Sequence, residues 1–331
     1  MEFLLQVKDL KTTFYLEDTV IRAVDGVSFT VRPGEVMGLV GESGCGKSVV
    51  SLSILRLVYY PPGRIEGGEV LFKEKNLLDL NEAEMRRIRG NEIAMIFQEP
   101  MISFNPVYTI GDQVAEVIRL HQGLEQNAAA KKVVEMLRLV GIPRPAEVLN
   151  EYPHQLSGGM RQRAMIAMAL SCNPSLLIAD EPTTALDVTI QAQILELMKD
   201  LKQQINTAII FITHDLGVIS EMAEHVVVMY AGKVVEDTDI VSLVSRPLHP
   251  YTVGLINSKP SLEDEKEILD FIPGSVPNPT AMPAGCSFHP RCPHTMDLCR
   301  REMPGVFEVE SGRKVRCWLY NRIKDHSHAD R

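Results

Sequence analysis

Apolar and polar positions are distributed along the first part of the chain in patterns that predict both strands and helices. Short apolar runs are typical of buried strands, and they occupy Val36–Val40, Ile93–Phe97, Leu176–Ala179 and Ala208–Thr213. Longer stretches with a helical spacing of apolar residues occupy 48–58, 110–122, 128–140 and 188–203. Strands that alternate with helices in this way predict an α/β fold.

Two regions depart from this alternation. Residues 3 to 36 read as short strands and turns, and residues 67–72 read as a further β segment. Residues 101 to 170 are mainly helical, which predicts a helical subdomain inserted into the α/β core. Near the end of the core, Val226–Tyr230 and Lys233–Glu236 predict a closing hairpin.

The length of 331 residues exceeds what one core usually supports, so we expect a main domain at 1–245 and an appendage at 246–331. The net charge of −9 gives no reason to expect a nucleic-acid surface. No apolar run reaches the length of a membrane span, and Met1–Leu5 lacks the basic region of a signal peptide. These features predict a cytoplasmic protein whose membrane role would need a separate partner.

The stretch from Gly41 to Ser48 reads G-x-x-x-x-G-K-S and lies between a predicted strand and a predicted helix. In this context the pattern indicates a phosphate-binding P-loop, because glycines let successive backbone N–H groups surround an anion. Lys47 supplies a positive charge for the β- and γ-phosphates, and the Ser48 hydroxyl suits Mg²⁺. The expected nucleotide contacts in and beside the loop are Ser43, Gly44, Cys45, Gly46, Lys47, Ser48 and Val49.

A second anion-binding feature follows the helical region. Ser157 is placed to cap a helix that runs through Leu170, and Gly158 and Gly159 expose its first N–H groups. This turn precedes the apolar strand that ends in two carboxylates, Asp180 and Glu181. Phosphoryl transfer depends on positioning and on charge stabilisation, so Asp180 is suited to Mg²⁺ and Glu181 to polarising the attacking water.

Four further residues are candidates for the same site. Gln98 ends a strand, and its amide oxygen can reach a metal or a water. His214 follows the strand Ala208–Thr213, where it would face the ligand and contact the γ-phosphate. Phe14 and Tyr15 lie in a polar segment before the first strands, where an aromatic ring could stack on adenine, and spacing favours Phe14. The alternative is that they are half-buried strand residues.

Together these motifs resemble the ATP-binding subunits of ABC transporters across roughly residues 3 to 245. The match consists of six motifs in the family's order, namely the Walker A loop at 41–48, Gln98, the signature at 156–160, Walker B at 176–181, the D-loop at 185–187 and His214. The resemblance implies a Mg²⁺-dependent ATPase in which two cassettes enclose two ATP molecules. Each ATP is held by the P-loop of one cassette and the Ser157 signature of the other. The departure is Met160, where the family often has Gln.

The appendage carries its own resemblance. Residues 249–255, 272–274 and 285–293 are similar to the C-terminal extension of dipeptide and oligopeptide importer ATPases, a branch that includes nickel and opine systems. The resemblance implies peptide uptake, a peripheral position on the cytoplasmic face of the cell membrane, and three kinds of partner. These are a second ATPase subunit (an F-type sibling or another copy), two transmembrane permeases and an extracytoplasmic peptide-binding protein. A soluble ABC ATPase that acts on nucleic acid or ribosomes is the rival class.

Four cysteines in the appendage suggest a metal centre. Cys286, Cys292, Cys299 and Cys317 are separated by five, six and seventeen residues, wider than the tight pairs of most zinc ribbons. This spacing favours a [4Fe–4S] cluster, as the resemblance also implies, with zinc and unliganded thiols as the alternatives. The expected architecture is therefore a P-loop NTPase core with an antiparallel β subdomain, a helical signature subdomain and a small C-terminal metal-binding extension.

Overall fold

The computed structural model of the chain describes residues 2–99, 103–184, 186–258 and 271–324. They form two compact units, each assembled from separate stretches of the chain. The first unit contains residues 1–4, 31–36 and 72–212, and the second contains residues 5–30, 37–71 and 213–331.

A parallel sheet is the centre of the first unit. Its strands β6 (Ile93–Ile96), β7 (Leu176–Asp180) and β8 (Ala208–Thr213) are paired in that order. Every residue of β7 and β8 is buried, which explains why each reads as a continuous apolar run instead of an alternating one. The predictions of these three strands are confirmed.

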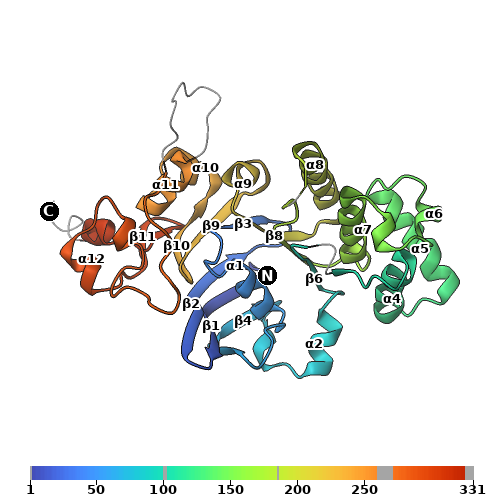
Figure 1. Ribbon diagram of the computed structural model, residues 1–331, viewed down its shortest axis with the longest axis horizontal. Coiled ribbons are helices and arrows are strands. Elements are labelled where there is room, and N and C mark those ends of the chain that lie inside the picture. Colours follow the sequence, from blue (N-terminus) through green and yellow to red (C-terminus); the bar gives the residue numbers. More distant parts are fainter. Residues whose placement is uncertain (1, 100–102, 185, 259–270, 325–331) are drawn as a thin grey trace. The chain divides into compact units, whose positions relative to one another are not determined.

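Four helices among the described residues form the helical part of the first unit, and buried residues spaced four apart mark the packed face of the first of them. Its helices are α4 (Ile110–Gln122), α5 (Gln126–Leu139), α6 (Pro145–Val148) and α7 (Gly158–Leu170), drawn in green in Figure 1. In α4 the side chains of Ile110, Val114 and Ile118 are fully buried, as the helical period requires. The same unit contains β5 (Lys75–Asn76), α2 (Glu82–Ile88) and α8 (Val188–Ile205). The helices expected at 110–122 and about 128–140 are present as α4 and α5, whereas α2 was not expected.

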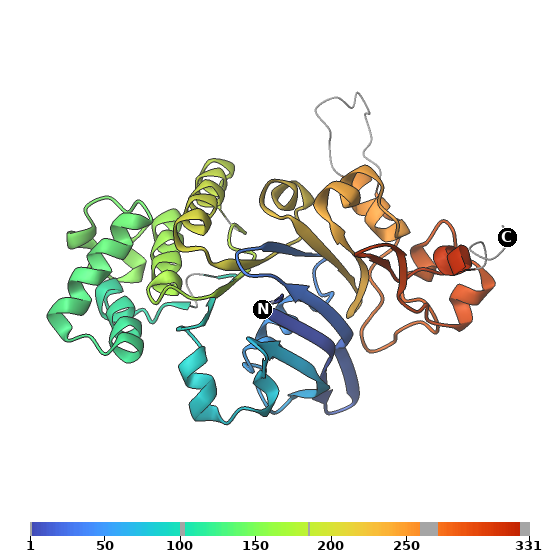
Figure 2. The same ribbon diagram turned by 180° about the vertical axis from the view of Figure 1, so that it is seen from behind.

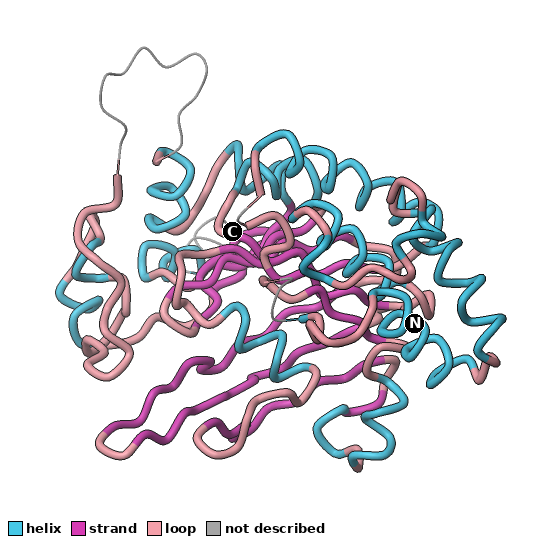
Figure 3. The backbone as a smooth tube through the Cα atoms, turned by 45° about the vertical axis from the view of Figure 1, so that its right-hand side comes forward, coloured by secondary structure: helices cyan, strands magenta, loops and turns pink. Residues whose placement is uncertain are grey.

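The second unit begins with long strands. Strands β1 (Leu5–Leu16), β2 (Thr19–Val31) and β4 (Gly63–Phe72) lie side by side in the order β2-β1-β4. They are labelled in Figure 1 and drawn in blue shades in Figure 2, and Figure 3 draws all strands in magenta. The prediction that Phe14 and Tyr15 lie in a polar segment ahead of the strands is wrong, because both belong to β1. Polar residues on the outer face of β1 interrupt its apolar pattern, which made the strand appear shorter in the sequence.

Strand β3 (Val36–Val40) is entirely buried and leads through the P-loop into α1 (Lys47–Ile54). The helix was expected to continue to about residue 58, but it stops after Ile54. Arg56 has a positive φ of 52°, a left-handed conformation that a helix cannot contain. The apolar residues beyond this point had suggested a longer helix.

The remaining strands of the second unit extend its sheet in the order β3-β9-β10-β12-β11. Strands β9 (His225–Tyr230) and β10 (Lys233–Asp239) form the predicted antiparallel hairpin. Strands β12 (Arg313–Val315) and β11 (Phe307–Glu310) come from the appendage and were not predicted. The helices of this region are α9 (Leu216–Met222), α10 (Ile240–Ser245), α11 (Pro250–Asn257) and α12 (Asp297–Arg301).

Glu236 of β10 fastens the start of the appendage to this sheet. Its side chain is fully buried, and its two carboxylate oxygens accept hydrogen bonds from the backbone N–H groups of Leu248 and His249, each at 2.9 Å. The buried guanidinium of Arg313 on β12 lies 3.7 Å from the same carboxylate. One acidic side chain therefore holds two separate segments of the appendage.

Replacing Glu236 by Ala removes both acceptors and takes from the Arg313 guanidinium its buried carboxylate partner, leaving it the exposed carboxylate of Glu310 at 3.9 Å. We expect the free energy of unfolding to fall by about 3 kcal/mol, measured by urea denaturation. The control is Glu69→Ala on β4, which removes an exposed carboxylate paired with Lys8 at 3.5 Å and should change stability by less than about 0.5 kcal/mol. Equal unfolding curves for Glu236→Ala and the wild type would contradict the anchoring role.

Candidate functional site

Close backbone packing shapes the P-loop. A Cβ atom on Gly41 would lie 2.2 Å from the carbonyl oxygen of Met229, and one on Gly46 would lie 2.3 Å from the carbonyl oxygen of Ala23. Gly46 also has a φ of 102°, which favours glycine. Ser43 and Gly44, at the tip of the loop, are exposed. The loop is thus fixed from behind by other backbone and open to solvent at its tip, as a phosphate site requires.

Lys47 is buried in the concavity of the loop, with only 5% of its surface exposed. Its ammonium donates hydrogen bonds to the carbonyl oxygens of Gly41 at 2.7 Å and Glu42 at 3.1 Å. Both acceptors are neutral, and charge-assisted bonds to anionic oxygens are stronger. The side chain is therefore held ready inside the loop and can exchange these carbonyls for phosphate oxygens.

The other predicted P-loop residues lie at the start of α1. Ser48 and Val49 are half-buried in its first turn. The thiol of Cys45 is buried, its pKa is raised by that burial, and its carbonyl accepts a hydrogen bond from Gly232 at 3.0 Å. Cys45 therefore acts through its backbone and its packing and not as a reactive thiolate.

His214 belongs to the same unit as the P-loop and follows β8 directly, as expected. Its side chain is exposed. The next residue, Asp215, accepts hydrogen bonds from the N–H groups of Gly217 at 2.7 Å and Val218 at 3.3 Å and so caps α9. The cap fixes the turn that carries His214.

The two carboxylates at the end of β7 have different environments within the first unit. Asp180 is buried, with 4% exposure, and Glu181 is half-buried. Glu181 has a φ of 47°, a left-handed conformation that costs a non-glycine residue on the order of 1–3 kcal/mol. Its N–H donates to the carbonyl of Ile212 at 2.9 Å, which holds this turn in place.

Two neighbours orient the Glu181 side chain. The amide nitrogen of Gln98 donates to its Oε2 at 3.0 Å, and the Thr184 hydroxyl donates to the same oxygen at 2.9 Å. The structure thus brings together Gln98 and Glu181, which are far apart in the sequence. Thr184 was not expected in the site, although its position three residues after Glu181 could have indicated it.

The signature turn has the predicted local geometry. Ser157 is exposed and caps α7, with its hydroxyl accepting from the N–H of Met160 at 3.3 Å. A Cβ atom on Gly159 would lie 2.9 Å from a methyl carbon of Ile190 at the start of α8, so glycine permits the close approach. Gly158 is half-buried at the first position of the helix. Of the predicted D-loop, Leu186 and Asp187 are described and Ala185 lies outside the described residues.

The two aromatic candidates have different surroundings on β1. Phe14 is half-buried against Gly63, where an added Cβ would lie 2.7 Å from a ring carbon. Tyr15 is 49% exposed, and its hydroxyl donates to Glu66 at 3.0 Å. Phe14 thus matches the half-buried strand residue that was the alternative interpretation.

The four cysteines of the appendage come together around one small cavity, together with the three histidines His249, His289 and His294. The cavity has a volume of about 10 Å³, which is roughly the room that one water needs. Each of the four is a free thiol. Burial raises the pKa of Cys317 to about 12, and burial lowers the pKa of His249 to about 3, so both groups are neutral.

A metal-binding extension is not confirmed by this arrangement. Among the described residues, no group of three or more His, Cys, Asp or Glu side chains has the geometry to hold a metal ion. The thiols share a cavity, but a space of one water does not accommodate a four-iron cluster without movement of the surrounding loops. The prediction of a cluster therefore stays untested, and no step of the chemistry depends on it.

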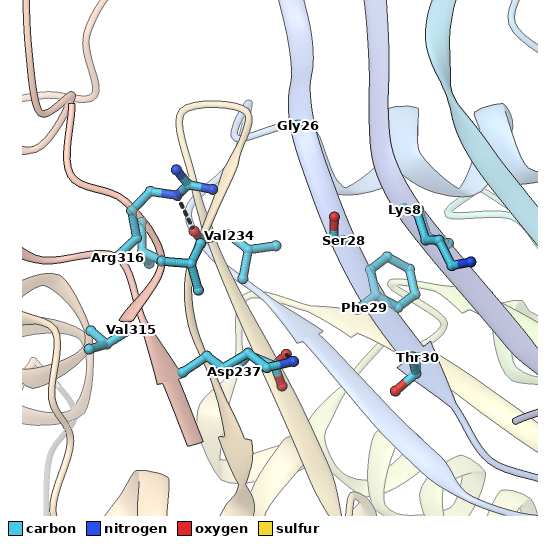
Figure 4. Close-up of a pocket in the computed structure, with 13 residues that line it drawn as sticks. Lys8, Gly26, Ser28, Phe29, Thr30, Val234, Asp237, Val315 and Arg316 are labelled. Atoms are coloured by element: carbon cyan, nitrogen blue, oxygen red, sulfur yellow. Dashed lines mark hydrogen bonds and ion pairs between the residues drawn. The ribbon is translucent and has the colours of Figure 1, made fainter. Parts of the chain in front are cut away.

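A larger cavity of about 380 Å³ lies elsewhere in the second unit, between residues of β1, β2, β10 and the appendage (Figure 4). Lys8, Ser28, Asp237 and Arg316 are among its lining residues, and Arg316 donates from Nε to the carbonyl of Val234 at 3.1 Å. None of its lining residues belongs to the P-loop or to the His214 turn. This cavity is therefore not the phosphate site.

The P-loop, the acidic strand end and the capped glycine turn define the chain as a P-loop nucleotide hydrolase. The family model described as ABC transporter matches residues 24–184, and the one described as oligopeptide/dipeptide transporter, C-terminal region, matches residues 235–299. The chain therefore belongs to the ATP-binding subunits of ABC transporters, in their oligopeptide and dipeptide branch, and is a transport ATPase.

Similar proteins agree with this placement. The oligopeptide transport ATP-binding protein AppD of Bacillus subtilis is 55% identical over 97% of this chain and 98% of its own length. The dipeptide transport ATP-binding protein DppD of Escherichia coli is 49% identical over 95% and 96%. The dimeric structure of MJ0796, a bacterial ABC transporter cassette, has a TM-score of 0.64 at 27% identity and covers 71% of this chain and 98% of that one. Within the described ranges, no helix is both long and apolar enough to span a bilayer.

Gly46→Ala tests the P-loop packing. The new methyl group would collide with the Ala23 carbonyl, so we expect the affinity for ATP to fall by more than about tenfold, measured with a fluorescent ATP analogue. The matched control is Gly67→Ala on β4, where an added Cβ meets nothing within 4 Å. Unchanged affinity in Gly46→Ala would mean that this loop does not bind the nucleotide.

Proposed function

We propose that this chain hydrolyses ATP to drive the import of dipeptides or oligopeptides across a cell membrane. The observation that carries the proposal is the similarity of its whole length to peptide transport ATP-binding proteins. It includes the region from residue 235 onward, which distinguishes this branch from other ABC cassettes. The domain organisation that we propose is an ATPase cassette at 1–245 and a branch-specific extension at 246–331.

We infer the following roles for the site residues. Lys47 and the loop amides bind the phosphates, and Ser48, Gln98 and Asp180 hold Mg²⁺. Glu181 is the general base for the attacking water, and His214 contacts the γ-phosphate. The hydrogen bonds from Gln98 and Thr184 support the role of Glu181, because they restrict its carboxylate to one orientation. Phe14, or Tyr15 beside it, contacts the adenine.

We propose that two cassettes act together. The signature residues Ser157, Gly158 and Gly159 would bind the nucleotide held by the partner's P-loop, and the exposure of Ser157 leaves it available for that contact. The solved cassette MJ0796, to which this chain is similar, is described as dimeric. The partner is a second copy or an F-type sibling.

The other proposed partners follow from the branch. They are two transmembrane permease subunits, contacted through the helical region about 101–170, and an extracytoplasmic peptide-binding protein. The chain would then lie at the cytoplasmic face of the membrane. Its net charge of −9 gives no support to a nucleic-acid partner.

Glu181→Gln tests the function and the base together. Because the amide cannot accept a proton, we expect ATP hydrolysis to fall by about 10²- to 10³-fold while ATP binding remains, so that an ATP-bound dimer accumulates. The measurement is ATPase rate, dimer mass and labelled-peptide uptake in vesicles that contain the assembled transporter. Uptake of nickel or an opine in place of peptides would redirect the assignment to those importers, and wild-type turnover would contradict the role of Glu181.

The control for this substitution is Glu196→Gln. Glu196 is exposed on α8 in the same unit, so the same chemical change is made outside the site. Its ATPase and uptake rates should equal those of the wild type. Co-purification of the wild type with nucleic acid or ribosomes, without permeases, would favour the rival class.

We also infer that the four appendage thiols bind a metal centre once their surroundings rearrange, with a [4Fe–4S] cluster as the first candidate and zinc as the alternative. Their gathering around one cavity supports the inference. Cys286, Cys292, Cys299 and Cys317 supply the four thiolates that either centre takes. Either centre needs the surroundings to rearrange; a single zinc ion needs the smaller enlargement of the cavity, whereas the wide spacing of the cysteines favours the cluster.

Anaerobic purification distinguishes these candidates. A cluster predicts about four iron and four sulfide per chain with broad visible absorbance, and zinc predicts one colourless metal ion per chain. Cys292→Ser should lower the metal content in either case, whereas Cys172→Ser, outside the appendage, should not. Purified protein that contains no metal and has all four appendage thiols free to react would contradict both centres.

A further inference from the structure

The second residue of the P-loop motif, Glu42, is paired with the appendage. Its carboxylate accepts two parallel hydrogen bonds from Arg291, from Nη1 to Oε2 at 2.7 Å and from Nη2 to Oε1 at 3.0 Å. The Arg291 side chain is only 4% exposed, and that of Glu42 is 28% exposed. A two-point contact of this kind fixes orientation as well as distance.

Arg291 is itself held rigidly. It donates to the carbonyl oxygens of Pro273 at 3.1 Å and Ile272 at 3.3 Å and to the Tyr230 hydroxyl at 3.4 Å. Its guanidinium carbon lies 5.9 Å from the ring centre of Tyr230 and 6.0 Å from that of Phe288. Burial lowers the pKa of Arg291, but the hydrogen bonds to Glu42 and Tyr230 outweigh burial and raise it, so the group is a permanent cation.

The backbone of Glu42 is also fixed. Its N–H donates to the hydroxyl of Tyr251 at 2.8 Å, and its carbonyl accepts from the Lys47 ammonium at 3.1 Å. Tyr251 is fully buried and packs on Tyr230 and Phe288, with ring centres 4.7 and 5.5 Å apart. Two of the three polar groups of Glu42 are therefore held by appendage residues, and the third is held by the P-loop lysine.

We propose that Arg291 is a positioning residue for ATP binding and that Tyr251 assists it, so that the appendage forms one wall of the P-loop. The proposal rests on the proposed function, in which this loop binds ATP. Two physical effects support it. Fixing Glu42 removes conformational freedom that the loop would otherwise lose on binding. Pairing its carboxylate also neutralises a negative charge beside the site for an anionic triphosphate.

Arg291→Ala is the first test, made in the full chain. We expect the dissociation constant for a fluorescent ATP analogue and the KM for MgATP to rise about tenfold, with kcat changed less than twofold, because Arg291 touches no reacting group. Arg291→Lys keeps the charge but loses the two-point geometry and should give about a threefold rise. The matched control is Arg246→Ala, which breaks an exposed Arg–Glu pair of the appendage and should leave both constants unchanged.

A second substitution separates positioning from general destabilisation. The proposal makes the unpaired Glu42 carboxylate part of the defect, so Glu42→Gln in the Arg291→Ala background should recover at least half of the lost affinity, even where thermal stability does not rise. Unchanged affinity in Arg291→Ala, or a loss that Glu42→Gln does not relieve, would overturn the proposal. If the wild type itself fails to bind or hydrolyse ATP, the proposed function fails instead, and the two failures are thus distinguishable.

Discussion

The structure depends on the P-loop, whose backbone packs closely against neighbouring backbone and still leaves its N–H groups accessible to an anion. The carbonyl oxygens of Met229 and Ala23 lie only 2.2 and 2.3 Å from where the Cβ atoms of Gly41 and Gly46 would be, and this close packing fixes the path of the loop. Rigidity at that point is what makes a loop of neutral amides an effective phosphate site, since no reorganisation is then needed on binding. The strand in front and the helix behind serve to hold the loop in this path.

The appendage participates in this arrangement through buried charge. Glu236 ties its first residues and its strand β12 to β10, while Arg291 and Tyr251 reach Glu42 in the loop. The carboxylates of Glu236 and Glu42 both accept hydrogen bonds from donors in the appendage. The segment that distinguishes this branch of ABC proteins is thus joined to the part that all of them share.

The sequence was sufficient for most of the central elements, because buried strands and amphipathic helices leave periodic patterns and the nucleotide motifs have fixed spacing. Strand β8 and helix α4 have the predicted bounds. It was insufficient where long-range pairing decides the structure. Strands β11 and β12 are short and polar on one face, and they are stabilised by the pairing of β12 with β10 and of β11 with β12. The Glu42–Arg291 contact joins residues 249 positions apart, and no local pattern reveals it.

Strand β10 has consequences for anyone who shortens this protein. In the full chain its outer edge is occupied by β12 through the pairs Glu236↔Val315 and Asp237↔Lys314. A cassette cut after α10 would present that edge bare, with the aromatic side chains of Tyr230 and neighbouring apolar residues uncovered beside it. Unprotected strand edges recruit other chains into intermolecular sheets. Fragments that end after the conserved ATPase region should therefore aggregate. Their low solubility would come from the exposed edge of β10, and it would say nothing about the full-length enzyme.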